Sequence, residues 1–503
     1  MNEIDRIRKK IDETDEKIAS LLNERMKLSE AVGRAKKGDS VSVRNREREE
    51  QVISRAASAA DGRFSYYVSG IYENIIAYSR LYQHEMGFVR GLVGERISAS
   101  CSPYIHSLFG DGSYRLAQMD ADDFPAFMKH RVFEGINVTM PFKRTAMALC
   151  DHVSETALGC SCVNTVVNRD GSLWGYNTDA FGFGHTLERY GIDVSGKRCL
   201  ILGSGASCGT VRYVLEKRGA KDVTVISRSD GDEYCDPKRY SYAQVIVNTT
   251  PVGMSPDCGS ALIDPGKFAE CEALVDIVYT PMSTELVLRA RDAGIRAVGG
   301  MDMLISQAWA SHELFCEREP SGDVPGDILS VAMRYPMNIV LVGMPGCGKS
   351  TVGSRLARDL GMDFVDTDRH IEKRTGRSPE ELIRRYGEKY FRGVEARSIL
   401  EVSSLRHTVI ACGGGAVLSA ENRRALRRNG VVVYLQRDLE SLCTRGRPLS
   451  SSREGLEKLY EQRKGIYEEC CDIMHSNAAG LEESVNGLRT ELDDLFAKMF
   501  REE

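Results

Sequence analysis

The stretch Gly343-Met-Pro-Gly-Cys-Gly-Lys-Ser-Thr351 directly follows the apolar run Met337–Val342. It reads G-x-x-x-x-G-K-S on a strand-to-helix turn, a loop whose backbone N–H groups enclose nucleotide phosphates. The pattern predicts that Lys349 bridges the β- and γ-phosphates and that Ser350 ligates Mg²⁺. The other loop residues expected to contact ATP are Gly343, Gly346, Gly348 and Thr351. Because the loop starts at position 343 of 503, a phosphoryl-transfer domain stands last and the preceding residues must form something else.

Length and composition limit the class of protein. At ~150 residues per domain, 503 residues predict about three domains. A net charge of −5 is too small to indicate a nucleic-acid or membrane partner. No apolar run approaches the ~18 residues of a membrane span, and the charged N-terminus has no secretory signal. The 15 cysteines are scattered without C-x-x-C, so we expect a cytoplasmic protein with reduced thiols.

Three sequence textures predict a multidomain chain. Residues 1–86 are charged, helical in pattern and free of proline, whereas residues 87–335 and 336–503 alternate β-branched runs with helical stretches. We expect an all-α domain followed by two α/β domains. The middle domain is expected to comprise a part at 87–190, a Rossmann part at 191–300 and closing helices at 301–335. The expected strands are 88–93, 135–140, 198–202, 222–227, 244–248, 273–278, 337–342, 363–365, 408–411 and 431–435.

The N-terminal helix carries a cation on its apolar stripe. Positions 4, 7, 11, 14, 18, 21, 25, 28 and 32 are apolar except Thr14 and Arg25, and Lys36 continues the same face. A later helix, 64–84, places Ser79 and Gln83 four residues apart. A buried guanidinium is costly unless it is paired, so converging cations indicate a dianionic ligand. The alternative is a dimerisation module whose long cations reach solvent.

These residues resemble the all-helical chorismate mutase family. The stretches that carry the resemblance are Ile7-Arg8-Lys9-Lys10-Ile11, Asn23-Glu24-Arg25, Gly33-Arg34-Ala35-Lys36, Arg46-Glu47-Arg48-Glu49 and Ser79 with Gln83. The resemblance implies that Arg8, Arg25, Arg46 and Ser79 bind the substrate carboxylates, Glu47 the ring hydroxyl, and Lys36 and Gln83 the ether oxygen. It also implies a homodimer in which Arg8 serves the partner's site. Such a rearrangement needs a compact dicarboxylate and positive charge at the ether oxygen, but no nucleophile.

The middle region contains a dinucleotide-type turn. Gly203-Ser-Gly205-Ala-Ser207-Cys-Gly209 follows one expected strand and opens a helix. The next strand ends in Ser227-Arg228, where an arginine suits the 2′-phosphate of NADP. The glycines alone could be a tight turn, and Arg228 alone could be a solvated loop cation.

Polar motifs on both sides of this turn resemble shikimate dehydrogenase over residues 88–333. They are Ser100-Cys-Ser102-Pro, Asn137-Val-Thr-Met-Pro-Phe-Lys143, Val163-Asn-Thr165, Asn177-Thr-Asp179, Asn248-Thr-Thr-Pro-Val-Gly253 and Gly300-Met-Asp-Met-Leu304. The resemblance implies that Ser100, Ser102, Thr139, Asn164, Tyr279 and Gln307 bind substrate. It makes Lys143 and Asp179 the catalytic pair and assigns Gly203, Gly205, Ser207, Arg228 and Gly300 to NADP. A quinate-type dehydrogenase that uses NAD is the alternative.

The last region resembles shikimate kinase over residues 337–477. The motifs are Val365-Asp-Thr-Asp368, Phe391-Arg392, Gly413-Gly-Gly415, Arg447-Pro-Leu449 and Gln462-Arg463. The resemblance implies that Asp366 assists Mg²⁺, Asp368 positions the acceptor hydroxyl, and Arg392 and Arg463 hold its carboxylate. It also implies that Gly413, Gly414 and Gly415 approach the ring and that Arg447 closes a lid.

The three resemblances together predict a multifunctional enzyme of aromatic amino acid biosynthesis. It would reduce 3-dehydroshikimate with NADPH, phosphorylate shikimate with ATP, and convert chorismate to prephenate. The alternative is a dehydrogenase and kinase whose N-terminal helices serve only in dimerisation or regulation.

Overall fold

The computed structural model describes residues 2–39, 43–85, 87–228, 239–320, 324–442, 453–478 and 480–500. The chain divides into two compact units. The first contains residues 1–178 and 308–321, and the second contains 179–307 and 322–503. In the described residues, no helix combines the length and apolarity needed to cross a bilayer. The expected domain boundaries at 86/87 and 335/336 stay predictions.

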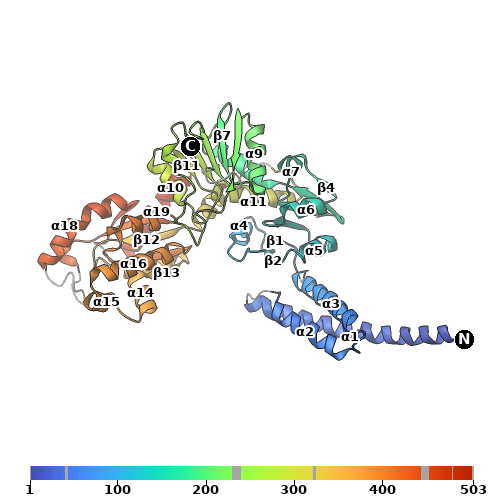
Figure 1. Ribbon diagram of the computed structural model, residues 1–503. Helices are drawn as coiled ribbons and strands as arrows, with labels where there is room; N and C mark the ends of the chain where they lie inside the picture. The colour runs from blue at the N-terminus through green and yellow to red at the C-terminus, as the bar shows by residue number, and fades with distance from the viewer. Residues whose placement is uncertain are drawn as a thin grey trace. The chain divides into compact units, whose positions relative to one another are not determined.

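Three helices open the first unit: α1 (Glu3–Asp39), α2 (Arg46–Ala59) and α3 (Ser65–Glu85). Figure 1 draws them in blue, and α3 packs against both α1 and α2. Asn45 caps α2, because its side chain accepts the backbone N–H of Arg48 at 3.0 Å. The apolar stripe of α1 is uncovered in the chain. Its exposed members are Ile4, Ile7, Ile11, Ile18, Leu21, Leu28 and Val32.

The rest of the first unit is built on a six-stranded sheet in the order β2-β1-β3-β5-β6-β4. Its strands are β1 (Arg90–Gly94), β2 (Tyr114–Gln118), β3 (Gly135–Val138), β4 (His152–Val153), β5 (Thr165–Arg169) and β6 (Ser172–Tyr176). The strands β1, β2 and β3 run parallel, whereas β5 is antiparallel to both β3 and β6. The helices are α4 (Ser102–Leu108), α5 (Phe124–His130), α6 (Lys143–Leu149) and α7 (Glu155–Cys160). Parallel strands end at one edge, and the segments that follow β1 and β3 carry Ser100, Thr139 and Lys143.

The second unit contains a five-stranded parallel sheet in the order β11-β10-β9-β7-β8. Its strands are β7 (Arg198–Leu202), β8 (Asp222–Ile226), β9 (Val245–Asn248), β10 (Ala273–Asp276) and β11 (Arg296–Val298). Its helices are α9 (Ala206–Lys217) and α10 (Glu285–Asp292). The division between the units falls inside α8 (Thr178–Arg189) and α11 (Met301–Phe315). The alternation of strands and helices confirms the expected Rossmann part.

A second parallel sheet in this unit has the order β13-β14-β12-β15-β16. Its strands are β12 (Asn338–Val342), β13 (Asp363–Asp366), β14 (Thr408–Ala411), β15 (Gly430–Gln436) and β16 (Ile473–Ser476). The helices are α12 (Gly326–Arg334), α13 (Lys349–Leu360), α14 (Thr367–Thr375), α15 (Pro379–Tyr386), α16 (Glu388–Ser403), α17 (Ala420–Arg427), α18 (Arg453–Cys470) and α19 (Leu481–Phe500). The central strand β12 is buried at all five positions, as expected for a parallel strand covered on both faces.

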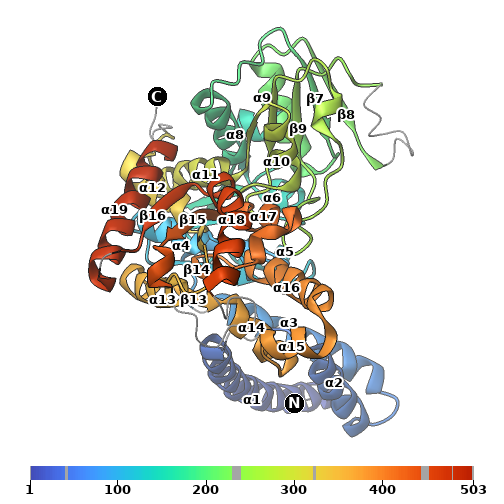
Figure 2. The same cartoon turned by 90° about the vertical axis from the view of Figure 1, so that its left-hand side faces the viewer.

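The terminal helix α19 packs against α12 and α13, and Figure 2 shows all three on one side of this sheet. Its core side chains are Val485, Leu488, Leu492 and Phe496. The tail that the sequence left without a role is therefore part of the kinase-like core.

Candidate active sites

The helices α1 and α3 bring three of the predicted mutase residues together. Arg25 on α1 donates to the hydroxyl of Ser79 on α3, and that hydroxyl donates to the carbonyl of Ile75 at 2.8 Å. The side-chain amide of Gln83 donates to the carbonyl of Ser79 at 3.2 Å, while its buried oxygen has no hydrogen-bond partner. A buried amide oxygen without a donor is costly, so the Gln83 side chain has hydrogen-bonding capacity that these residues leave unused.

In the described residues, the other predicted mutase side chains form no hydrogen bond with these three. Lys36, near the end of α1, donates to the carbonyl of Val43. Arg46 and Glu47 are exposed in the first turn of α2. Arg8 is exposed on α1, 17 positions before Arg25, which places it about 25 Å along the helix. Within one chain, Arg8 therefore cannot join Arg25 at the same small ligand.

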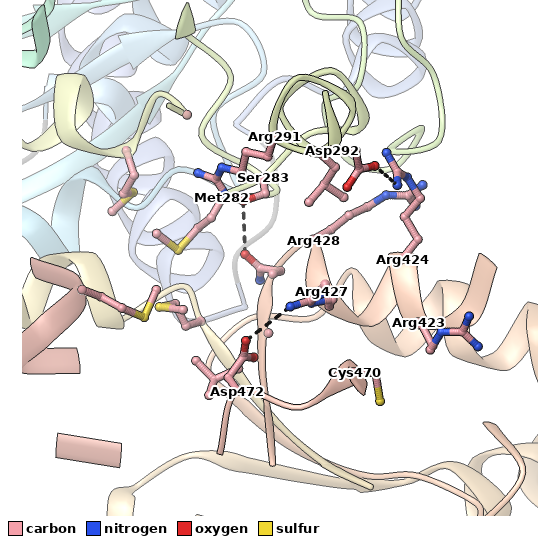
Figure 3. A pocket seen from close by; sticks show the side chains of 18 of the residues that line it. Met282, Ser283, Arg291, Asp292, Arg423, Arg424, Arg427, Arg428, Cys470 and Asp472 are labelled. Atoms are coloured by element: carbon pink, nitrogen blue, oxygen red, sulfur yellow. Dashed lines mark hydrogen bonds and ion pairs between the residues drawn. The ribbon is translucent and has the colours of Figure 1, made fainter. Parts of the chain in front are cut away.

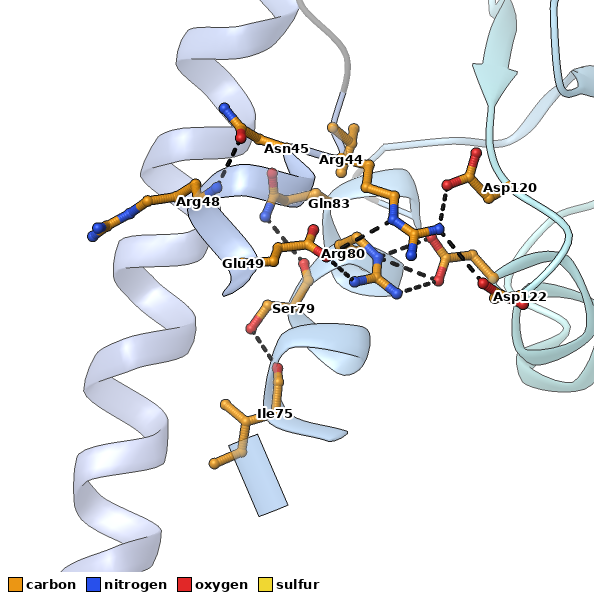
Figure 4. Close-up of polar contacts among 12 residues, drawn as sticks. Arg44, Asn45, Arg48, Glu49, Ile75, Ser79, Arg80, Gln83, Asp120 and Asp122 are labelled. Atoms are coloured by element: carbon orange, nitrogen blue, oxygen red, sulfur yellow. Dashed lines mark hydrogen bonds and ion pairs between the residues drawn. The ribbon is translucent and has the colours of Figure 1, made fainter. Parts of the chain in front are cut away.

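A buried ion-pair network that sequence reasoning missed fixes α3 in place (Figure 4). Arg80, between Ser79 and Gln83, donates to both oxygens of Asp123 at 2.8 and 3.0 Å and to Glu49 at 2.8 Å. Arg44 donates to Asp120, and the hydrogen bond to Asp123 raises the pKa of Arg80. Asp123 directly precedes α5, so the mutase-like helices are tied to the sheet-containing part of the first unit.

We expect Asp123→Ala to weaken this attachment strongly. Loss of one partner leaves the Arg80 guanidinium buried without its bidentate carboxylate, which costs about 3–5 kcal/mol. Hydrogen exchange of α3 amides measures the local loss. Asp122→Ala is the matched control, because Asp122 is 78% exposed and should change local stability by less than about 1 kcal/mol. Equal exchange rates in the two variants would contradict a structural role for the Arg80–Asp123 pair.

His84 makes the same region sensitive to acid. Burial lowers its pKa to about 4 from 6.5, so the ring is neutral in the folded state at pH 5. Because the folded pKa lies below the unfolded one, stability present above pH 6.5 is lost as pH falls through 4, by about 3 kcal/mol. Hydrogen exchange of α3 between pH 7 and 4 should show this loss in the natural chain and a flatter profile in His84→Gln. Parallel profiles would argue against His84 as the titrating group.

The first unit carries the predicted polyol-binding residues on a buried polar network. Asn164 donates to the hydroxyl of Thr178 at 3.0 Å and accepts its backbone N–H at 2.7 Å. The network continues from Thr178 to Ser311 at 2.9 Å. Ser100 donates to the hydroxyl of Ser102 at 3.0 Å. Fully hydrogen-bonded networks of this kind hold side chains in one orientation.

Lys143 is placed by its backbone. It is the first residue of α6, and its carbonyl accepts the N–H of Val163 at 3.1 Å, next to Asn164. The preceding Phe142 is buried and stacks on Phe124 with centroids 4.5 Å apart. The predicted partners Asp179, Tyr279 and Gln307 lie in the second unit, so their pairing with Lys143 stays a prediction.

The dinucleotide turn fits a pyrophosphate. Gly203 has φ +103°, and a Cβ there would lie 2.7 Å from Thr250, so only glycine suits this turn. Gly205 caps α9 without a side-chain hydrogen bond, and a Cβ there would meet nothing within 4 Å. Space in front of a helix N-terminus is where a phosphate binds. Arg228 is exposed just beyond β8, as an NADP 2′-phosphate requires. Ser207 lies in the first turn of α9. Gly300 has no room for a side chain, because a Cβ there would lie 2.1 Å from the carbonyl oxygen of Ile277.

The phosphate loop forms the wall of a cavity of about 620 Å³. Lys349 is buried and donates to the carbonyls of Gly343 and Met344 at 2.9 and 3.0 Å. Gly348, with φ +103°, opens α13 without a side-chain cap. The hydroxyl of Ser350 lies 2.5 Å from a carboxylate oxygen of Asp366. Two neighbouring oxygen groups beside a phosphate loop fit Mg²⁺.

The predicted acceptor residues line the same cavity. Arg463 is buried and donates to the carbonyl of Gly414 at 3.0 Å. Arg392 pairs with Glu395 at 2.7 Å, and an added Cβ on Gly415 would lie 2.3 Å from its guanidinium. The cavity thus brings together Gly346, Gly348, Lys349, Ser350, Thr351, Asp366, Asp368, Arg392, Gly413, Gly414, Gly415 and Arg463. Arg447 lies outside the described residues.

Glu395 is a site residue that sequence reasoning missed. It is 2% exposed, lines the same cavity, and burial raises the pKa of its carboxyl against the opposing charge of Arg392. Its position three residues after Arg392 on one helix face was the available signal. It can hold the guanidinium in the orientation that a carboxylate ligand needs.

Comparison with known proteins places each region. A family model described as chorismate mutase type II matches residues 7–84, and one described as shikimate kinase matches residues 345–492. The model described as shikimate dehydrogenase substrate binding domain matches residues 92–166. Shikimate dehydrogenase (NADP(+)) of Clostridium perfringens (strain SM101 / Type A) is 32% identical over 246 residues, covering 45% of this chain and 91% of that protein. The chain belongs to the shikimate dehydrogenase family.

Two further proteins are similar to part of this chain. The NADP(+) enzyme of Symbiobacterium thermophilum is 33% identical over 270 residues, covering 47% of this chain and 92% of its own length. A chorismate mutase/shikimate 5-dehydrogenase fusion protein from Clostridium acetobutylicum has a solved structure that is 30% identical, with TM-score 0.43, covering 49% of this chain and 95% of its own. The family matches confirm the three resemblances and indicate one enzyme with dehydrogenase, kinase and mutase domains.

Proposed function

We propose that this chain reduces 3-dehydroshikimate to shikimate with NADPH, phosphorylates the 3-hydroxyl of shikimate with ATP, and rearranges chorismate to prephenate. The kinase cavity carries the proposal, because it joins a phosphate loop to two arginines and an acidic residue suited to a hydroxylated carboxylate. Relatives of the middle region are named for dehydrogenation of the same acid.

In the kinase site, the residues mainly position and neutralise charge. Bound ATP supplies the phosphoryl group, and Ser350 and Asp366 would hold its Mg²⁺. Arg392 and Arg463 bind the acceptor carboxylate, and Asp368 orients the attacking hydroxyl. Lys349 exchanges its carbonyl partners for phosphate oxygens, which stabilises the charge of the transferring group.

In the dehydrogenase site, the protein must deliver one proton. Bound NADPH supplies the hydride, after which the former ketone oxygen needs a proton. We assign that proton to the Lys143 ammonium, with Asp179 orienting the lysine. Ser100 and Ser102 bind the carboxylate, and Thr139, Asn164, Tyr279 and Gln307 hold the ring oxygens.

In the mutase site, Arg25 and Ser79 bind one carboxylate, while Lys36 and Gln83 donate to the ether oxygen as its bond breaks. The seven exposed apolar residues of α1 support a homodimer through this helix, since a stripe so long and uncovered is unfavourable in water. The 25 Å between Arg8 and Arg25 supports the assignment of Arg8 to the partner's site. We also expect a reducing cytoplasmic location, because the 13 cysteines among the described residues are free thiols.

Three steady-state assays on one purified preparation test the proposal, with the molar mass measured on the same sample. We expect turnover of all three substrates, NADP⁺ preferred over NAD⁺, shikimate preferred over quinate, and a dimer. Preference for NAD⁺ and quinate would overturn the dehydrogenase assignment. An unconverted chorismate with the other two activities intact would leave the N-terminal helices a dimerisation module only.

A further inference from the structure

A second cavity in the second unit lies away from the phosphate loop. It measures about 840 Å³ and shares no lining residue with the kinase cavity. Figure 3 shows it between α10, at Arg291 and Asp292, and α17, at Arg423, Arg424 and Arg427. Cavities of 300–1,000 Å³ are the usual size for small-molecule sites.

Ion pairs hold its two sides together. Glu285 at the start of α10 accepts from Arg424 at 2.9 Å and from Arg428 at 3.1 Å. Asp292 pairs with Arg424 at 2.6 Å, and the N–H of Ser283 donates to the carbonyl of Arg428 at 2.9 Å. Arg424 and Arg428 are therefore both paired with carboxylates of the protein.

Arg291 is different. It donates to the carbonyl of Ala297 at 3.2 Å and to the hydroxyl of Ser283 at 3.1 Å, but no carboxylate among the described residues pairs with it. Arg291 is exposed to water. Nearby protein atoms still displace part of the water around its guanidinium, and this desolvation lowers the pKa of the group. Across the cavity, Arg427 has only a loose pair with Asp472, at 3.6 Å (Figure 3). These guanidinium groups leave capacity for one added anion.

The remaining wall is apolar and adaptable. Methionine side chains fit ligands of irregular shape and contact aromatic rings favourably. The apolar lining includes Met282, Met301, Met333, Met337, Met499, Leu288 and Leu495. Two exposed carboxylates, Glu421 and Glu469, also line the cavity and disfavour a polyanion such as a nucleotide. The lining therefore suits a single negative charge on an apolar body.

We propose that this cavity binds a small organic monoanion, a carboxylate carried on an aromatic or branched apolar group, with Arg291 as its principal charge partner. The cavity shares no lining residue with the kinase cavity, and the proposal does not depend on the catalytic assignments. Its occupant would contact α10 and α17 together.

Methionine-methyl NMR of the full chain tests the proposal, with phenylacetate as the probe and benzyl alcohol as its uncharged control. We expect phenylacetate to shift the methyl signals of Met282, Met333 and Met337 saturably, and benzyl alcohol to bind at least tenfold more weakly. Arg291→Gln should weaken phenylacetate binding tenfold or more. Arg489→Gln is the matched control, because Arg489 is an exposed arginine of α19 outside the cavity lining, and this variant should bind phenylacetate normally.

A second variant keeps the proposal testable if Arg291→Gln does not fold. Met499→Trp adds bulk at an exposed position on the cavity wall and should also abolish the shifts. Shifts confined to Met26, Met140 or Met344, which lie beside the catalytic residues Ser79, Thr139 and the phosphate loop, would overturn the proposal. So would cavity shifts that persist unchanged in both variants.

Discussion

Replacing Lys143 with alanine is expected to lower the kcat of the dehydrogenase reaction by about 10²–10⁴-fold, the usual contribution of a positioned general acid. Hydride addition leaves an alkoxide that must be protonated, and the variant has no ammonium at the start of α6 to do so. Because α6 remains anchored through the Lys143 carbonyl and the buried Phe142, the substrate-binding residues stay in place. The loss should therefore appear in kcat and leave KM within a few-fold.

Steady-state reduction of 3-dehydroshikimate measures both constants, and the kinase and mutase rates of the same preparation report on folding. Lys129→Ala is the matched control, since Lys129 is an exposed lysine on the neighbouring helix α5 and should keep full activity. A raised KM with unchanged kcat would make Lys143 a binding residue. An unchanged kcat/KM would remove it from the mechanism.

The bounds of a strand could be predicted best where they depend only on the residues of that strand. The ranges expected for β7 and β14 match the structure residue for residue, because short buried runs between turn signals have few alternatives. The hairpin of β5 and β6 was missed although its signal was present. Asp170-Gly171 adopts φ +50° and +85°, the conformation that such a pair favours in a two-residue hairpin turn. A weaker alternation on either side hid it.

The residues of the candidate sites also differ in whether local sequence could predict them. Motif residues such as Lys349, Ser350 and Asp366 were predictable, because phosphate and magnesium chemistry restricts residue type and spacing. The Arg80–Asp123 pair was not, since it joins helices 43 residues apart and neither residue belongs to a motif. Arg291 was equally invisible, because its lack of a carboxylate partner depends on the packing of two α/β domains. Local pattern predicts elements and motifs, whereas pairing across elements follows from the fold.

For the mutase reaction, we expect Lys36→Met to lower kcat by about 10²–10³-fold, the effect of removing one donor from a site of developing negative charge. Methionine keeps the length and apolar contacts of the lysine chain but supplies no ammonium to the ether oxygen. Arg25, Ser79 and Gln83 are bonded to one another and not to Lys36, so carboxylate binding should survive. KM for chorismate should then change less than kcat.

Conversion of chorismate to prephenate measures the effect, with shikimate oxidation and phosphorylation followed on the same sample. Lys27→Met is the matched control, because Lys27 is exposed on the same helix and forms no hydrogen bond with Ser79 or Gln83. The hydrogen bond from Lys36 to the Val43 carbonyl offers a competing structural explanation. Hydrogen exchange of α1 and α2 separates the two. A loss of activity with native exchange identifies an electrostatic role, whereas faster exchange together with loss of all three activities would make Lys36 a structural residue.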